Sequence, residues 1–284
     1  MSKVALVTDS TSYIPKEIRE KYPITVVPQV VIWEGQTYED DVTITPEQFY
    51  TRLRTAKVMP STSQASVVNM HKAFSTLIEQ GYDVLGIFVS AKLSGTFQSA
   101  SLGREQLTSG REKVDFIDSE TTAMAMGFMV LQVARAAQEG ASLADCKALA
   151  EKARNHVGVY LTVETLEFLH RGGRIGGAQR FLGTALNLKP ILAIQDGRVE
   201  AVERVRTRGK ALDRVVELVV EKCAGKTPVR LATLHADSES DARIMLDKIA
   251  PMVNPVESVF AAVSPAVGAN AGPGTVGLAW MAGM

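Results

Sequence analysis

Residues 84–100 read VLGIFVSAKLSGTFQSA, and this stretch indicates the architecture of the first half of the chain. Val84 to Val89 is an unbroken apolar run with the length of a buried strand, and Ser94 to Leu107 has the length and composition of a helix. A strand that leads into a helix through a short loop is typical of a parallel sheet, because parallel neighbours need a crossover connection between them.

The same alternation of strands and helices continues on both sides of this unit. The strand-like runs are 4–7, 24–33 and 114–117, and the helical segments are 16–21, 45–55, 67–80, 122–139 and 143–155. One helix start is well marked, because Thr45 is followed by Pro46 and by Gln48 in a capping box. The pattern predicts an α/β fold with a doubly wound, mostly parallel sheet.

The pattern changes in the second half of the chain. Asp196-Gly197 separates the strand-like runs 191–194 and 199–206 and is a strong hairpin signal, which implies antiparallel pairing. Helices at 209–223 and 240–249 and strands at 229–234 and 258–263 follow. We therefore predict two domains, an N-terminal parallel-sheet α/β domain over residues 1–160 and a C-terminal α/β domain with a mixed sheet over residues 161–284.

Composition narrows the classes of function. The 284 residues contain 31 basic and 31 acidic side chains, so no field of one sign is available for nucleic acid or a membrane surface. Cys146 and Cys223 form no CxxC pair and no zinc spacing, and no apolar stretch reaches the roughly 18 residues of a membrane span. We expect a soluble, cytoplasmic protein with no metal, no cofactor and no nucleic-acid partner.

Polar residues follow two of the predicted strands, where doubly wound sheets bind ligands. Asp9 and Ser10 come directly after the first strand, and Ser94 and Gly95 would place a hydroxyl and free backbone N–H groups at a helix N-terminus, a ready anion site. Simple helix capping explains both segments equally well. The hydroxyl-rich loop 60–64 is either a further ligand contact or a solvated loop.

Two glycine-rich segments lie in the second half. Arg171 and Arg174 flank paired glycines and could bind phosphate, although a turn with solvated arginines accounts for them too. The run 272–277 matches GxGxxG but lacks the strand–helix–strand unit of a dinucleotide site. The histidines show no metal spacing, and no nucleophile elbow or P-loop is present, so support for a self-contained enzyme is thin.

Several of these motifs together resemble one family. Their order and spacing are similar to those of the DegV family of bacterial fatty-acid-binding proteins, and the resemblance covers nearly the whole chain. The motifs are TDSTS at 8–12, STSQ at 61–64, LSGTFQSA at 93–100, LHRGGRIG at 169–176 and GPG at 272–274.

The resemblance implies two α/β domains with a buried acyl tunnel between them. It implies that the fatty-acid carboxylate sits near Thr62, Ser63, Ser94 and Gly95, with Asp9 and Ser10 shaping the site. Some members deliver the fatty acid to a separate ATP-dependent fatty acid kinase subunit that forms acyl-phosphate. In that setting Arg171 and Arg174 are expected to contact phosphate or the kinase. Transient contact of the protein with a membrane is a further alternative.

One residue departs from the family pattern. Many members carry a histidine two residues before the GPG motif, where it binds the carboxylate, and this chain has Asn270. An amide donates a hydrogen bond but cannot become cationic or shuttle a proton. We expect Asn270 to contribute to carboxylate binding with less charge assistance than the histidine would give. Acyl-phosphate formation, if it depends on an ionisable group at this position, is in doubt.

The resemblance predicts a lipid-binding protein and not an enzyme: it would hold a long-chain fatty acid non-covalently and present it to a kinase or carry it. The main alternative is a small-carboxylate hydrolase or phosphotransferase that uses the same cleft. A lipid-sensing regulator is a third reading. The apolar helix with Met124, Met126 and Met129 would either line the tunnel or pack in the core.

Overall fold

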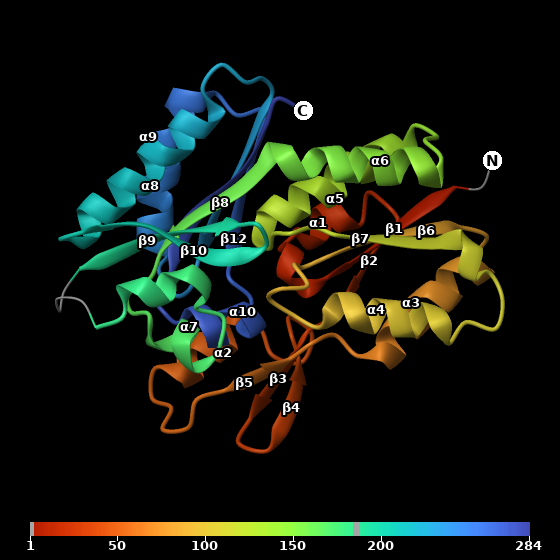
Figure 1. Ribbon diagram of the computed structural model, residues 1–284, viewed down its shortest axis with the longest axis horizontal. Coiled ribbons are helices and arrows are strands. Elements are labelled where there is room, and N and C mark those ends of the chain that lie inside the picture. The colour runs from red at the N-terminus through yellow and green to blue at the C-terminus, as the bar shows by residue number, and fades with distance from the viewer. Residues whose placement is uncertain (1–2, 184–187) are drawn as a thin grey trace.

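The computed structural model describes residues 3–183 and 188–284. Its first sheet is entirely parallel, with the strand order β2-β1-β6-β7. The strands are β1 (Val4–Asp9), β2 (Ile24–Val27), β6 (Asp83–Phe88) and β7 (Val114–Asp118). Two helices pack on each face, and Figure 1 shows them on either side of the sheet: α3 (Val67–Glu79) with α4 (Thr96–Glu105), and α5 (Ala123–Gln138) with α6 (Leu143–Ala153). The predicted doubly wound parallel sheet is confirmed.

The second sheet is mixed, with the strand order β10-β9-β8-β13-β11-β12. Its strands are β8 (Val157–Thr162), β9 (Lys189–Gln195), β10 (Arg198–Val205), β11 (Val229–His235), β12 (Glu257–Ala262) and β13 (Val276–Ala282). Only β11 and β12 pair in parallel, and α8 (Arg208–Cys223) and α9 (Glu239–Val253) cover one face. Asp196 and Gly197 form the β9–β10 turn with φ of +47° and +74°, which confirms the predicted hairpin.

Helix α5 lies between the two sheets, where it contacts β1 and β6 on one side and β8 and β13 on the other. Twelve of its 16 residues are buried, as expected for a helix that is apolar all round. Met124, Met126 and Met129 are fully buried in this shared core and do not line the cavity described below. Core packing, and not a tunnel lining, is therefore their role.

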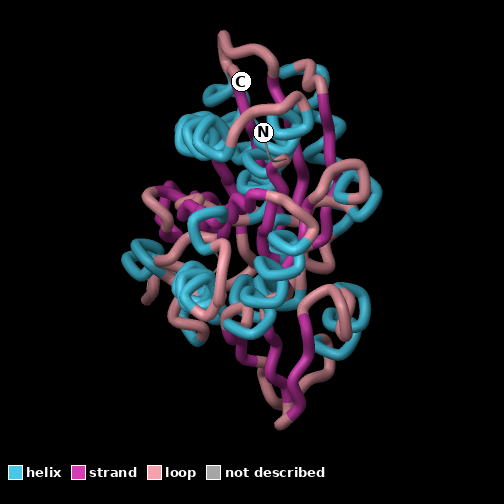
Figure 2. Tube along the Cα trace, turned by 90° about the vertical axis from the view of Figure 1, so that its right-hand side faces the viewer, coloured by secondary structure: helices cyan, strands magenta, loops and turns pink. Residues whose placement is uncertain are grey.

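A small antiparallel sheet, β4-β3-β5, was not predicted. It comprises β3 (Val30–Trp33), β4 (Gln36–Glu39) and β5 (Ser61–Ser63) and lies at the end of the molecule opposite the chain termini (Figures 1 and 2). The predicted strand 24–33 is in fact two strands in different sheets, because Pro28 interrupts the ladder. The predicted loop 60–64 contains β5, whose Thr62 pairs with Val31.

Short helices and turns connect these elements. They are η1 (Ser10–Ser12), α1 (Lys16–Arg19), α2 (Pro46–Leu53), η2 (Arg111–Lys113), η3 (Arg154–His156), α7 (Glu167–Arg171), η4 (Gly176–Phe181) and α10 (Pro265–Ala271). The capping box at Thr45 and Gln48 forms as predicted. The predicted domain boundary at residue 160 lies inside β8, all of which belongs to the mixed sheet. Across the described residues no helix is long and apolar enough to cross a membrane.

Candidate functional site

A cavity lies between the two sheets, at the carboxyl edge of the parallel sheet. Its polar end is lined by Thr62, Ser63, Gln64, Ser94, Arg174 and Asn270. Its apolar wall includes Val89, Ala123, Val159, Leu161, Ile194, Val199, Leu234 and Val263. The structure therefore brings together residues far apart in the sequence, such as Thr62 and Asn270, which are 208 positions apart.

Ser94 belongs to a chain of hydrogen bonds that starts in the core. Gln29 Nε2 donates to Thr96 Oγ1 over 2.8 Å, and the hydroxyl oxygens of Thr96 and Ser94 lie 2.9 Å apart. Gln29 and Thr96 are both buried, so this part of the chain is fixed. The Thr96 hydroxyl has one hydrogen, which it donates either to Gln29 Oε1, 3.1 Å away, or to Ser94. The hydroxyl hydrogen of Ser94 is free to turn toward the cavity only in the second arrangement. Sequence reasoning missed Gln29 and Thr96, although Thr96 lies in the LSGT motif.

Asn270, on α10, fixes the direction of the Thr62 hydroxyl. Its Nδ2 donates to the Ala266 carbonyl over 3.0 Å and to Thr62 Oγ1 over 3.2 Å. A carbonyl can only accept, so the nitrogen of the amide must face Ala266. Thr62 accepts from Asn270 and keeps its own hydrogen to donate. The Asn270 Oδ1 packs on Gly172, where an added Cβ would lie only 2.0 Å away.

The two predicted arginines occupy different places. Arg174 lines the cavity, and its Nε and Nη1 donate to the carbonyls of Leu93 (3.0 Å) and Gly172 (2.6 Å). It thereby ties the loop after β6 to the segment after α7. Arg171 lies on the surface outside the cavity lining, 2.6 Å from Glu167 in an exposed ion pair.

The other predicted residues stand behind the cavity wall. Gly95 precedes α4 and packs beside Gln64, where an added Cβ would meet the Gln64 Cδ at 3.2 Å. Asp9 is buried and accepts from the Thr11 backbone and hydroxyl (3.0 and 2.7 Å) and from the Val89 backbone (2.8 Å). Burial raises the pKa of Asp9. Asp9 caps η1, and its hydrogen bonds to Thr11 hold that residue in the cavity wall.

Ser10 leads to a buried carboxylate that sequence reasoning missed. Its hydroxyl donates to Asp40 Oδ2 over 2.6 Å, and Asp40 Oδ1 accepts from the Ala266 backbone over 2.9 Å. Asp40 therefore connects the loop after β1 to α10, the helix that carries Asn270. Burial raises the pKa of Asp40 to about 6. An acidic residue just after a strand was the sole signal for it in the sequence.

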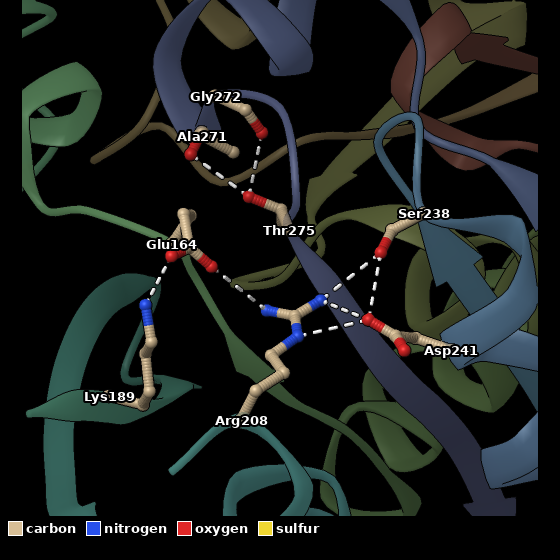
Figure 3. Close-up of polar contacts among 8 residues, drawn as sticks. All are labelled: Glu164, Lys189, Arg208, Ser238, Asp241, Ala271, Gly272 and Thr275. Atoms are coloured by element: carbon tan, nitrogen blue, oxygen red, sulfur yellow. Dashed lines mark hydrogen bonds and ion pairs between the residues drawn. The ribbon is translucent and has the colours of Figure 1, made fainter. Parts of the chain in front are cut away.

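A polar network anchors the segments that carry the second-half motifs (Figure 3). Arg208 donates to Asp241 over 3.0 and 2.8 Å, and it also lies 4.0 Å from Glu164, which pairs with Lys189. The Thr275 hydroxyl lies 2.9 Å from the carbonyls of both Ala271 and Gly272. These contacts fix the GPG turn after α10 and the segment between β8 and α7.

The polar groups that line the cavity are hydroxyls, side-chain amides and the guanidinium of Arg174. In the part of the chain that the structure describes, no carboxylate, imidazole or thiol lines the cavity. A search over the same residues finds no cluster of side chains that could hold a metal ion.

Fold and site together define an α/β protein with two large sheets and an apolar cavity between them that ends in hydrogen-bonding groups. A family model described as "Uncharacterised protein, DegV family" matches residues 3–283. The chain belongs to the DegV family.

Curated relatives and solved structures agree with this assignment. Protein DegV of Bacillus subtilis is 34% identical over 98% of both chains, and a DegV domain-containing protein of Clostridium perfringens is 33% identical over 98% of both. The structure is similar to that of a DegV family protein from Thermus thermophilus described for its fatty acid binding, with 34% identity, 99% coverage of both chains and a TM-score of 0.92. It is also similar to the fatty acid binding protein DegV from Bacillus subtilis, with 31% identity, 99% and 100% coverage and a TM-score of 0.90.

Proposed function

We propose that this protein binds a long-chain fatty acid non-covalently, with the acyl chain in the cavity and the carboxylate at its polar end. One observation carries the proposal: an apolar wall ends in hydroxyl groups that are hydrogen-bonded to neighbouring side chains. The fatty acid binding of the similar Thermus thermophilus and Bacillus subtilis proteins supports it.

The acyl chain supplies the affinity. A long chain has about a dozen or more methylenes, each worth roughly 0.8 kcal/mol when buried, or about 10 kcal/mol gross. Ordering the ligand reduces this sum, yet tight binding remains within reach. Strands supply part of the apolar wall, and sheet register sets the positions of these residues, which are Val159, Leu161, Ile194, Val199 and Leu234.

The polar end satisfies the carboxylate, which costs too much to bury without hydrogen bonds. Thr62 has a hydroxyl hydrogen left to donate, Ser94 has one when Thr96 donates to it, and Ser63 lines the same end. Arg174 keeps N–H groups beyond the two that bond to Leu93 and Gly172, and its positive charge lies at the cavity. Asn270 assists by orienting Thr62 rather than by contributing a charge.

The protein then serves as a carrier and not as an enzyme. It would present the carboxylate to a separate ATP-dependent fatty acid kinase in the cytoplasm, with transient membrane contact for loading. Arg174 at the cavity and exposed Arg171 are the candidate contacts to a transferred phosphate or to the kinase surface. Because Asn270 cannot exchange a proton, any proton transfer in acyl-phosphate formation falls to the partner.

The test is mass spectrometry of the organic extract of purified protein under native and denaturing conditions. A roughly stoichiometric long-chain fatty acid that is released on denaturation is expected. The Ser94→Ala/Thr62→Ala double variant should retain much less of it, because each lost hydrogen bond to a charged group costs about 1.5–3 kcal/mol. Thr108→Ala/Ser109→Ala, which removes two exposed hydroxyls far from the cavity, is the matched control.

Two results would contradict the proposal. One is the absence of bound lipid together with no rise in melting temperature on addition of fatty acid. The other is an unchanged fatty-acid affinity in a folded Ser94→Ala/Thr62→Ala variant.

A further inference from the structure

A second cavity lies behind the first one. It is formed by the segment after β1, by the segment after β4 and by the end of β12, and it reaches the surface beside the exposed Lys16. Among residues 3–183 and 188–284, Tyr13 is the one side chain that lines both cavities. The ring of Tyr13 is therefore part of the wall that separates them.

The backbone holds Tyr13 in an unusual conformation. Its φ of +54° and ψ of +21° lie in the left-handed region, which bulky residues rarely adopt. The segment around it has no freedom to relax, because it packs directly on α5: a Cβ on Gly127 would lie 2.5 Å from the Ser12 carbonyl oxygen and 3.2 Å from Ile14 Cγ1. Strain of this kind persists where the surrounding structure fixes it, often at functional sites.

The two cavities differ in what they offer an acyl chain. Beyond Tyr13 the lining is mixed: apolar side chains such as Ile14 and Phe260 lie beside charged ones, which are Lys16, Arg19, Asp40 and Asp41. Ser264 and Asp40 lie near the Tyr13 hydroxyl, and burial raises the pKa of Tyr13. The aromatic ring thus separates the first cavity from the charged groups of the second cavity and also from its apolar part.

We propose that Tyr13 sets the longest acyl chain that the protein accepts, by closing the first cavity against the second. This inference rests on the proposed fatty-acid binding. It assigns chain-length selection to one side chain directly after the TDSTS motif, outside the groups that hold the carboxylate.

The test compares binding of laurate, myristate, palmitate, stearate and arachidate to the wild type, Tyr13→Gly and Tyr13→Phe. Glycine opens the wall and suits a positive φ, so this variant should fold well. Its optimum is expected to move to longer chains, with affinity rising by at most about fourfold for each methylene that enters the second cavity, since that cavity is only partly apolar. Tyr13→Phe keeps the ring and should keep the wild-type optimum.

The inference fails if folded Tyr13→Gly keeps the wild-type optimum, or if Tyr13→Phe shifts it as much as Tyr13→Gly does. Tyr13→Asn, which also suits a positive φ, provides a second open variant if Tyr13→Gly is unstable. A wild-type protein that binds none of the five acids would instead contradict the proposed function. The two failures are therefore distinguishable.

Discussion

The two ends of the cavity are built in different ways. Strands supply part of the apolar wall: Val159 and Leu161 of β8 face the cavity, while Tyr160 between them points to the other face and stacks on Trp280. The polar end consists of side chains from short elements and loops, held by hydrogen bonds to other side chains or to backbone carbonyls. Sheet register therefore fixes the strand part of the apolar wall, whereas the polar end depends on individual hydrogen bonds.

This difference predicts how far the effect of a substitution should spread from its own position. A substitution in the apolar wall alters the space for the ligand and little else, because the backbone ladder stays intact. A substitution at the polar end should spread to its neighbours, because each group orients the next one. The following predictions test this contrast.

Leu234→Trp should have the largest effect. Leu234 lies on β11 and faces the cavity, so a larger ring would fill space that the acyl chain needs. Excluding three or four methylenes should weaken fatty-acid binding about a hundredfold, measured by titration calorimetry, while the melting temperature of the free protein changes little. Leu102→Trp, on an exposed site of α4, is the control and should leave both values unchanged. Equal affinities of the two variants would refute this view of the wall.

Gly172→Ala should act on the polar end through another residue. The added methyl group would lie 2.0 Å from Asn270 Oδ1 and must displace Asn270 from Thr62. Loss of one oriented hydrogen bond to the carboxylate should weaken binding about tenfold. Gly209→Ala is the matched control, since nothing lies within 4 Å of its added Cβ and its helix should gain about 0.5–1 kcal/mol. An unchanged affinity in Gly172→Ala would show that Asn270 does not orient Thr62.

Asp40→Asn should change how stability depends on pH. Because the pKa of Asp40 is about 6, above its ordinary value of 3.8, the folded protein binds this proton more tightly than the unfolded chain. The contribution of Asp40 to stability should therefore increase as the pH falls through about 6. The melting temperature of the wild type, relative to Asp40→Asn, should rise by about 2 °C or more between about pH 7.5 and about pH 5.

Other titrating groups, including the buried Asp9, are common to both proteins and cancel in this difference. A difference in melting temperature that stays constant over the same range would contradict the prediction. Ligand affinity measured in parallel would show whether the loop–α10 connection through Asp40 matters for binding.

Arg171→Ala should have the smallest effect on the isolated protein. Its ion pair with Glu167 is more than half exposed on both sides, so it contributes at most about 0.5 kcal/mol. Fatty-acid affinity should stay within about twofold of the wild type, whereas Arg174→Ala, at the cavity, should lower it more. A larger loss from Arg171→Ala would place that side chain, and not Arg174, at the carboxylate.

Local signals predicted the features that depend on neighbours in sequence. The capping box at Thr45 and the turn at Asp196 are examples, since their hydrogen bonds join residues a few positions apart. Strand β13 was missed although its continuous apolar run is typical of a buried strand, whereas its place between β8 and β11 follows from long-range pairing.

The candidate site shows the same limit. Ser94, Thr62 and Asn270 were predicted because they lie in motifs that resemble those of a family, and the structure brings them to one cavity. Asp40 and Tyr13 gave little signal, because their roles arise from contacts with distant elements. Such roles are properties of the packed structure and not of any short segment.

The position of α5 limits how a lipid can enter. Since this helix is packed against both sheets, the two halves cannot swing apart like a clamshell without exposing side chains such as Phe128 to water. If the proposed fatty acid enters this cavity, it would enter by local parting of the surface segments, and the hydrogen bond from Arg174 to the Leu93 carbonyl would have to open. Uptake would then be a local gating event that leaves the packing of α5 against both sheets intact.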